Sequence, residues 1–271
     1  METLILEDTQ IIEKQNRLLE EKNRAITESL NYAKLIQNAI THKNETLSKV
    51  VPQSFILDMP LDIVSGDFVR IDQKEGKILI GLADCTGHGI PGALMSMVGC
   101  ALLYDIINCK QETRPAEILK SLNSNFKKLT SEPTAINDGM DISYCSIDVS
   151  SLTLNYSGAK RPLFIVRNGV FTEIKGDNLS IGGHSGKESE FKSFIFKLQK
   201  NDTLYMFSDG FGDQFGGDKG KKYSTQRFKE TLLSIQHLEM QEQRAYLEQE
   251  INEWKKGLAQ VDDICVLGFR I

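Results

Sequence analysis

Positive charge, long hydrophobic runs and clustered cysteines are all scarce in this sequence of 271 residues. Its 32 Lys and Arg residues are outnumbered by 37 Asp and Glu residues, which gives a formal net charge of −5. The sequence therefore lacks the basic character of a nucleic-acid-binding protein, and no nucleic-acid partner is expected.

The five cysteines form neither a C-x-x-C pair nor a zinc-ligand spacing, and an odd number cannot all pair within one chain. They are predicted to be free thiols in a reducing compartment. Residues 1–20 also lack the basic start and the apolar run of a signal peptide. Together these features predict a cytoplasmic protein.

No hydrophobic stretch has the pattern of a membrane span. The longest one, Ile90–Ile107, is interrupted by Ser96 and Asp105 and has Pro91 where a helix favours proline as its first residue. This pattern indicates a buried helix, so no direct membrane contact is expected. With 40% hydrophobic and 25% charged residues, the composition is that of a globular protein with a substantial core.

Near the N-terminus an aliphatic residue or alanine recurs at every seventh position: Ile5, Ile12, Leu19, Ile26, Ala33 and Ile40. Polar residues such as Asn16 and Asn23 occupy several intervening positions of the 3-4 spacing, and buried Asn favours a parallel two-stranded coiled coil. Residues 1–45 are therefore predicted to be a helical linker that forms a homodimer through residues 5–40. The alternative is a single helix lying on the downstream domain, since Leu4, Ile11, Leu18 and Tyr32 widen the apolar stripe.

Residues 46–271 are predicted to form one globular domain. Strand patterns cover Asp62–Asp72, Lys77–Ala83, about 142–207 with a hairpin at Asn168-Gly169, and Ile264–Ile271, whereas helical patterns cover about 91–108, 114–130, 224–236 and 240–256. The strands come in adjacent runs rather than in βαβ alternation. This order predicts an α+β fold in which antiparallel sheets carry helix pairs.

Aspartates gather at or beside the ends of the apolar strands: Asp67, Asp84, Asp209, Asp262 and Asp263. Converging carboxylates repel one another unless a cation lies between them. Oxygen ligands with few histidines nearby select Mg²⁺ or Mn²⁺ over zinc. The pattern predicts a hydrolytic centre with two such ions, although a single Asp-Gly pair is also a common turn.

Three glycines, Gly87, Gly89 and Gly92, follow Asp84 in a loop that leads from a strand into a helix. Such a loop presents backbone N–H groups and a helix N-terminus, which suit an anionic ligand. Gly87 and Gly89 are therefore candidate substrate-binding residues.

In these motifs the sequence resembles the metal-dependent PPM-type serine/threonine phosphatases, specifically their bacterial SpoIIE/RsbU-like branch. The motifs occur in the same order over about residues 30–271: Ser65–Phe68, Asp84–Gly89, Ser157–Ala159 before Pro162-Leu163, Ser208–Gly210 and Asp262–Ile264. The segment Asn31–Gln37 resembles the helical linker that precedes the catalytic domain in sensor-coupled members. The resemblance implies an αββα sandwich with two metal ions in a cleft between the sheet rims.

By the same resemblance, Asp84 would bridge two Mn²⁺ or Mg²⁺ ions, with the carbonyl of Cys85 completing one coordination sphere. Asp209 and Asp262 would hold the second ion, Asp67 would bind in the inner or outer coordination shell, and Asp263 would support them. Asp84, Asp67 and Asp209 are thus the predicted catalytic residues. A metal-bridging hydroxide would attack phosphorus in line with the leaving seryl or threonyl oxygen.

The resemblance implies a phosphorylated protein as substrate, with a STAS-type anti-sigma-factor antagonist as the candidate, and regulation through the N-terminal helix. Arg70 is a further candidate for contact with the substrate phosphate, with a solvated side chain as the alternative. His88 is either a loop histidine bonded to backbone or a catalytic group. The glycine-rich, basic segment Gln214–Lys222 is either a flap that recruits an acidic phosphoprotein or a solvated loop.

Two other functions are weighed against this one. A sensor histidine kinase fragment would be phosphorylated on His42, but strand patterns follow His42 where a second helix is needed. A catalytically weak or inactive relative acting as a binding module would be expected to lose ligands, and every proposed ligand aspartate is present.

Overall fold

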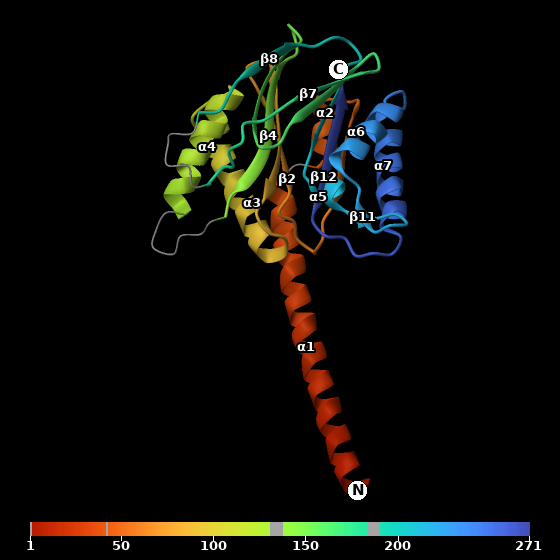
Figure 1. Ribbon diagram of the computed structural model, residues 1–271. Coiled ribbons are helices and arrows are strands. Elements are labelled where there is room, and N and C mark those ends of the chain that lie inside the picture. Colours follow the sequence, from red (N-terminus) through yellow and green to blue (C-terminus); the bar gives the residue numbers. More distant parts are fainter. Residues whose placement is uncertain (1, 42, 131–137, 184–189) are drawn as a thin grey trace.

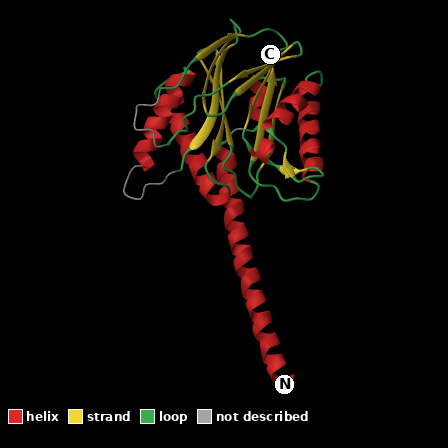
Figure 2. Cartoon of the chain, viewed as in Figure 1, coloured by secondary structure: helices red, strands yellow, loops and turns green. Residues whose placement is uncertain are grey.

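Two five-stranded antiparallel sheets face each other at the centre of the protein, and helices cover the outer face of each sheet (Figure 1, Figure 2). This computed structural model describes residues 2–41, 43–130, 138–183 and 190–271. His42, the residue of the histidine kinase hypothesis, lies outside the described residues. The segment that follows it contains three strands rather than a second long helix, which does not fit a histidine kinase.

The strands divide evenly between the two sheets. The first sheet has the order β1 (Ser54–Met59), β12 (Ile264–Arg270), β9 (Thr203–Phe207), β6 (Leu163–Arg167) and β7 (Val170–Ile174). The second has the order β2 (Phe68–Lys74), β3 (Lys77–Cys85), β4 (Met140–Asp148), β5 (Thr153–Ala159) and β8 (Phe194–Lys197). A small separate hairpin pairs β10 (Phe215–Gly216) with β11 (Lys221–Lys222).

The helices form two outer layers and one long projection. The described helices are α1 (Glu2–Ile40), α2 (Asn44–Val50), α3 (Gly89–Tyr104) with its π-helical end η1 (Asp105–Cys109), α4 (Pro115–Thr130), α5 (Gly210–Asp213), α6 (Thr225–Ser234) and α7 (Met240–Lys255). Helices α3 and α4 pack on the second sheet, and α6 and α7 pack on the first. This order of layers confirms the predicted αββα sandwich.

Side chains that alternate along each strand explain the layers. In β3, Ile78, Ile80 and Leu82 enter the core between the two sheets, while Leu79 and Ala83 pack under α3 and α4. A strand that is buried on both faces reads as a nearly continuous hydrophobic run, as this one does. The sheet ends are thereby fixed in position by packing on both sides.

The helices after residue 88, the hairpin at Asn168-Gly169 and the last strand confirm the sequence predictions. The strand predicted from Asp62 is wrong for its first part, because β2 begins only at Phe68. Residues 60–67 turn instead, since both carboxylate oxygens of Asp263 accept backbone N–H groups there, from Leu61 and from Gly66.

The basic segment Gln214–Lys222 is neither a free flap nor a fully solvated loop. It contains the β10–β11 hairpin, and the N–H of Gly217 donates to the carbonyl of Trp254 in α7 at 2.8 Å. An added Cβ at Gly216 would lie 1.9 Å from the same carbonyl oxygen, so the hairpin packs tightly against α7.

Within the described residues, one continuous helical stretch, Gly89–Cys109, is long and apolar enough in composition to cross a membrane. Its inner face belongs to the core under the second sheet, with Cys100 and Leu103 almost fully buried. Its outer face exposes Ile90, Leu94 and Tyr104, each by more than half of its surface. The prediction of a buried helix therefore holds for one face only.

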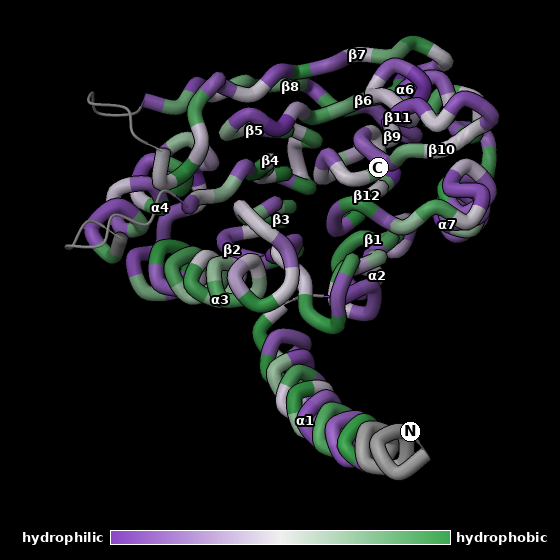
Figure 3. Tube along the Cα trace, turned by 60° about the horizontal axis from the view of Figure 1, so that its bottom comes forward, coloured by the Kyte–Doolittle hydropathy of each residue, from purple (hydrophilic) through white to green (hydrophobic). Residues whose placement is uncertain are grey.

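Helix α1 leaves the sandwich and projects far from it (Figure 1). Hydrophilic and hydrophobic residues mix along the projecting part (Figure 3), where Ile12, Leu19 and Ile26 are 55–57% exposed. The last turns differ, because Gln37 and Thr41 are buried against the domain. The end of the heptad pattern therefore packs on the chain's own domain, as the single-helix alternative expects, whereas the dimer through the projecting part stays a prediction.

Candidate active site

The rims of the two sheets bring four of the predicted aspartates together. Asp84 lies near the end of β3 in the second sheet, opposite Asp141 of β4. Asp209 lies two residues after β9 of the first sheet, and its backbone N–H donates to Asp84 Oδ2 at 3.4 Å. Asp67 stands one residue before β2, and Asp262 two residues before β12. The site therefore lies where the two sheets meet, as the sequence predicts.

An arginine that sequence reasoning missed lies among these carboxylates. Arg161, in the connection between β5 and β6, donates through Nη2 to Asp84 Oδ2 at 2.7 Å and to Asp209 Oδ2 at 2.6 Å. It lies between Ala159 and Pro162, inside one of the motifs that carry the family resemblance. A signal was available in the sequence, because Arg161 lies between two strands in a protein whose aspartates lie at other strand ends.

Asp67 is the most enclosed carboxylate of the group. Its side chain is 7% exposed, and Oδ2 has no hydrogen-bond partner among the described residues. A buried carboxylate oxygen without a donor is costly, and a cation ligand position is one explanation for it. Asp67 therefore fits the predicted metal-binding role.

Glycines allow three segments to meet behind these side chains. An added Cβ at Gly92 of α3 would lie 2.1 Å from the carbonyl oxygen of Gly87, and one at Gly66 would lie 2.8 Å from the same atom. The carbonyl oxygen of Cys85, a predicted ligand, lies 3.2 Å from that position at Gly66. No side chain fits in this junction, so glycine is required to hold the Asp67 turn against the loop after β3.

The electrostatics of the cluster favour cations. Burial, together with the charges of Asp209 and Asp262, raises the pKa of Asp84 to about 7, against the lowering effect of Arg161. Burial, with Asp84 next in importance, raises the pKa of Asp67 well above its usual range, and burial also raises that of Asp262. Three carboxylates that resist ionisation near one another are stabilised as anions by a bound divalent ion.

The donor set fits Mg²⁺ or Mn²⁺, because it consists of carboxylates and one backbone carbonyl. In the described parts of the chain, no group of three or more His, Cys, Asp or Glu side chains is arranged closely enough to hold an ion. The Cys85 thiol is no ligand in this arrangement, since burial raises its pKa well above the usual range and it packs under the second sheet.

Cation binding is expected to strengthen as the pH rises. A carboxyl whose folded pKa is about 7 is mostly protonated at pH 6 and mostly ionised at pH 8, and a metal ligand has to be ionised. Titration calorimetry with Mn²⁺ should show an affinity about tenfold higher at pH 8 than at pH 6. An affinity that stays constant or falls over this range would contradict the assignment of Asp84 as a ligand.

The same pKa shifts predict the opposite trend for the stability of the metal-free protein. A carboxyl with a raised pKa holds its proton more tightly in the folded state than in the unfolded state. The folded state therefore loses stability as the pH rises from about 4 towards the folded pKa of about 7. Thermal unfolding in chelator should occur at a lower temperature at pH 7.5 than at pH 5.5.

The predicted substrate-binding residues do not all lie at the site: the two glycines do, and Arg70 does not. Gly87 and Gly89 adopt positive φ angles of 83° and 62° at the start of α3, next to the aspartate cluster. Asp62 Oδ2 lies 2.7 Å from an added Cβ at Gly89 and 3.2 Å from His88 Nδ1, so an anion there would have Asp62 as a neighbour. His88 is exposed and pairs with this carboxylate rather than with backbone.

Arg70 is not a substrate-binding residue in this structure, and it is not solvated either. It lies within β2, is 7% exposed, and donates Nε and Nη2 to the two oxygens of Asp72 at 2.7 Å each. Arg70 pairs with Gly81 of β3, four residues from the rim that carries Cys85. Its guanidinium is therefore committed to a buried ion pair away from the site.

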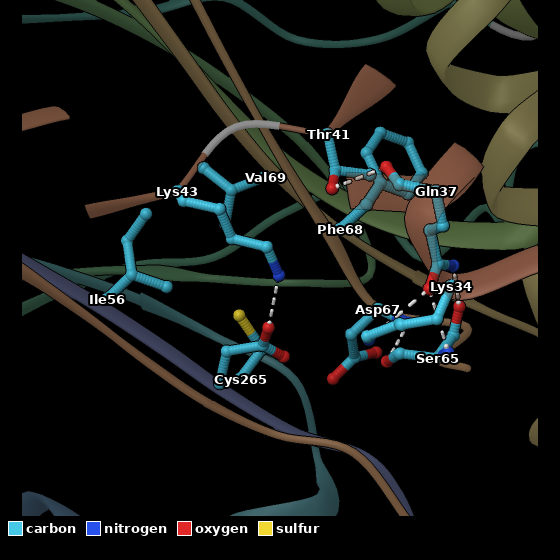
Figure 4. Close-up of a pocket in the computed structure, with 11 residues that line it drawn as sticks. Lys34, Gln37, Thr41, Lys43, Ile56, Ser65, Asp67, Phe68, Val69 and Cys265 are labelled. Carbon is cyan, nitrogen blue, oxygen red and sulfur yellow. Dashed lines mark hydrogen bonds and ion pairs between the residues drawn. The ribbon is translucent and has the colours of Figure 1, made fainter. Parts of the chain in front are cut away.

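A second residue that the sequence did not reveal connects α1 to the Asp67 turn. Gln37 Nε2 donates to the Ser65 carbonyl at 2.6 Å and to Ser96 Oγ of α3 at 2.9 Å, and the Ser65 N–H donates back to Gln37 Oε1 at 3.2 Å. Figure 4 shows Gln37 and Ser65 together beside Asp67, with Lys34 of the same helix nearby. Hydrogen bonds thus attach the end of α1 to Ser65, two residues before the candidate ligand Asp67.

Comparisons with known proteins agree with this geometry. The family described as stage II sporulation protein E (SpoIIE) matches residues 74–271. Phosphoserine phosphatase RsbU of Bacillus subtilis (strain 168) is 27% identical over an alignment of 186 residues, with 65% of this chain and 52% of that protein covered. The chain thus spans about half the length of this curated relative.

Among solved structures, the SiaA-PP2C domain of Pseudomonas aeruginosa is similar with a TM-score of 0.84 and 32% identity, covering 92% of this chain and 98% of that one. RsbX in complex with magnesium has a TM-score of 0.55 and 12% identity, covering 80% of this chain and 94% of that one. At that identity, the second similarity concerns the fold alone.

Proposed function

The chain belongs to the SpoIIE family of PP2C-type serine phosphatases, and from this premise we propose that it is a metal-dependent protein serine/threonine phosphatase. The observation that carries the proposal is the meeting of Asp67, Asp84, Asp209 and Asp262 at the rims of both sheets. Three of them have raised pKa values, so the cluster favours divalent cations.

In this proposal Asp84 and Asp209 supply oxygens from opposite sheets, Asp262 and the Cys85 carbonyl add to them, and Asp67 binds from the buried side. Two Mn²⁺ or Mg²⁺ ions, when bound, supply an acidified water and compensate the charge of the phosphoryl group. The N–H groups of the Gly87–Gly89 loop and the start of α3 orient the substrate phosphate.

The proposed substrate is a phosphoserine or phosphothreonine residue of a signalling protein. RsbU, a phosphoserine phosphatase, supports the substrate class, and a STAS-type anti-sigma-factor antagonist is the partner that the resemblance favours.

We propose a cytoplasmic location for the protein. The free state of all five cysteines supports this proposal, since disulfides are rare in the reducing cytoplasm.

The test is a phosphatase assay of the purified chain on a phosphoserine peptide. Turnover is expected with Mn²⁺ or Mg²⁺, to disappear on addition of a chelator, and to return when metal is restored in excess. Turnover that resists the chelator would contradict the metal-dependent mechanism. Metal binding without turnover on any phosphopeptide would favour the alternative of an inactive, phosphatase-like binding module.

Regulation is proposed to enter through α1. Gln37 connects this helix to the turn that carries Asp67 and to α3. Farther up the helix, Leu30 lines an open hollow with Ile63, Val64 and the Gly87–Pro91 segment. A rotation or shift of α1 would therefore act on both the Asp67 turn and the phosphate loop.

The projecting part of α1 is proposed to form a parallel dimer. Its seam is shorter than the predicted residues 5–40, because Leu30, Ala33, Gln37 and Ile40 face the chain's own domain at least in part. Ile12, Leu19 and Ile26 remain exposed, which leaves them available to a second copy. Light scattering at micromolar concentration should therefore give the mass of a dimer.

Leu19→Glu should convert this dimer to a monomer, because a charge would lie in the apolar seam. Leu18→Glu is the matched control: Leu18 is similarly exposed, 52% against 57%, but lies on the outer side of the heptad pattern. The control should remain dimeric. A monomeric wild-type chain, or equal effects of both substitutions, would contradict the seam.

A further inference from the structure

One arginine lies inside the carboxylate cluster of the candidate active site. Arg161 Nη2 is 2.7 Å from Asp84 Oδ2, 2.6 Å from Asp209 Oδ2 and 3.7 Å from Asp141 Oδ2. The Arg161 side chain is only 12% exposed, so water screens these contacts weakly. A single nitrogen therefore joins carboxylates from both sheets, and two of these are candidate metal ligands.

Arg161 is bound less completely than other arginines of this protein. Arg70 and Arg167 each donate through Nε and Nη2 to both oxygens of one aspartate, the geometry that satisfies a guanidinium and a carboxylate together. Arg161 shares one nitrogen between two carboxylates, and its buried Nε has no hydrogen-bond partner in the described parts of the chain. Because an unpaired buried donor is costly, this guanidinium is held less favourably than the others.

The charge of the cluster is also incompletely balanced. The guanidinium of Arg161 interacts with the carboxylates of Asp84, Asp209 and Asp141 and, more weakly, with that of Asp67. Asp67 Oδ2 has no donor among the described residues. A divalent cation between Asp84 and Asp209 would need the same two oxygens that Arg161 now holds. The guanidinium and the cation therefore compete for one position.

We propose that Arg161 is the resident counter-ion of the aspartate cluster, which holds the two sheet rims together in the metal-free protein and which a divalent cation has to displace. This inference rests on the proposed function. The backbone at Arg161 is fixed, since its N–H donates to the Ala159 carbonyl and its carbonyl accepts from the Tyr156 hydroxyl. Displacement therefore moves the side chain while the β5–β6 connection stays in place.

The test compares the full-length wild-type chain with Arg161→Gln by calorimetric titration of the metal-free protein with Mn²⁺, and by thermal unfolding with chelator and with Mn²⁺. Removal of the competing cation should raise the Mn²⁺ affinity roughly tenfold. It should also lower the unfolding temperature in chelator and leave that of the Mn²⁺-bound protein nearly unchanged. A residue with a merely structural role would not strengthen metal binding when it is removed.

Arg167→Gln is the matched control, because Arg167 also forms an ion pair with an aspartate, Asp202, but outside the aspartate cluster. It should lower the unfolding temperature equally with and without Mn²⁺ and leave the Mn²⁺ affinity unchanged. Arg161→Lys should shift the affinity in the same direction as Arg161→Gln but less, and it serves as the test variant if the glutamine variant does not fold. If the wild-type chain binds Mn²⁺ and the Arg161 variants bind it equally or more weakly, this inference alone is overturned. If the wild-type chain binds no Mn²⁺, the proposed function is overturned as well.

Discussion

Asp84→Asn is expected to abolish metal-dependent turnover while the fold is retained. Asp84 Oδ2 links the rims of the two sheets, since it accepts hydrogen bonds from the Asp209 N–H and from Arg161. Asparagine has nearly the same shape but lacks the negative charge that a hard cation needs. The rate on a phosphoserine peptide at fixed Mn²⁺ should fall at least about 100-fold, because even the partners of metal ligands contribute 10- to 100-fold.

Asp218→Asn is the control for this substitution. Asp218 also carries one negative charge, but it lies in the basic hairpin segment, is 89% exposed, and pairs with Lys256. It should keep full activity and full Mn²⁺ affinity. Circular dichroism should give the same secondary structure for both variants, and full turnover by a folded Asp84→Asn protein would contradict the assignment of Asp84.

The sequence predicts most of this fold because its local patterns agree with its tertiary structure. The Asn168-Gly169 pair has positive φ angles at both residues, 49° and 78°, and closes the β6–β7 hairpin as expected. The strand-forming residues Ile63 and Val64 suggest a strand from Asp62, yet Asp263 accepts the backbone N–H groups of Leu61 and Gly66 on either side, 202 and 197 positions away in the sequence. No pattern along the chain reveals a partner at that distance.

The candidate site also contains residues that the sequence could predict and residues that it could not. The aspartates were predictable because a strand end delivers its residues to a sheet rim, whatever the rest of the chain does. Arg161 was not, because its importance arises only when β5 and β9 bring it between two carboxylates. For Arg70 a signal existed: residues two apart lie on the same face of a strand, so the partner Asp72 could have been read from the sequence.

The heptad pattern at the N-terminus was ambiguous for a physical reason. The same apolar spacing serves a partner helix and the surface of a domain, and nothing in the spacing marks where one ends and the other begins. In this chain the change comes near Leu30, and the polar residue Gln37 at a seam position is buried against the domain. Its amide bonds to Ser65 and Ser96 explain why a polar residue is accommodated there.

Gln37→Ala is expected to weaken both the fold and the metal site. The Ser65 N–H, buried and bonded to Gln37 Oε1, would lose its partner, which costs about 1–3 kcal/mol in the free energy of unfolding. The turn that leads to Asp67 would also lose its attachment to α1. Since groups that position ligands contribute 10- to 100-fold to metal affinity, the Mn²⁺ concentration for half-maximal activity should rise about tenfold.

Two controls separate this effect from a general loss of stability. Gln10→Ala removes the same side chain from an exposed position on the same helix and should change neither the Mn²⁺ titration nor the unfolding free energy. Ile251→Val, in the core under the first sheet, should lower stability by about 0.5–1.5 kcal/mol without changing the Mn²⁺ requirement. If Gln37→Ala lost stability but titrated with Mn²⁺ like Ile251→Val, the helix would be a structural attachment only, and control of the Asp67 turn through α1 would have to be abandoned. A raised Mn²⁺ requirement in Gln37→Ala alone would identify this amide as the connection between the projecting helix and the catalytic aspartates.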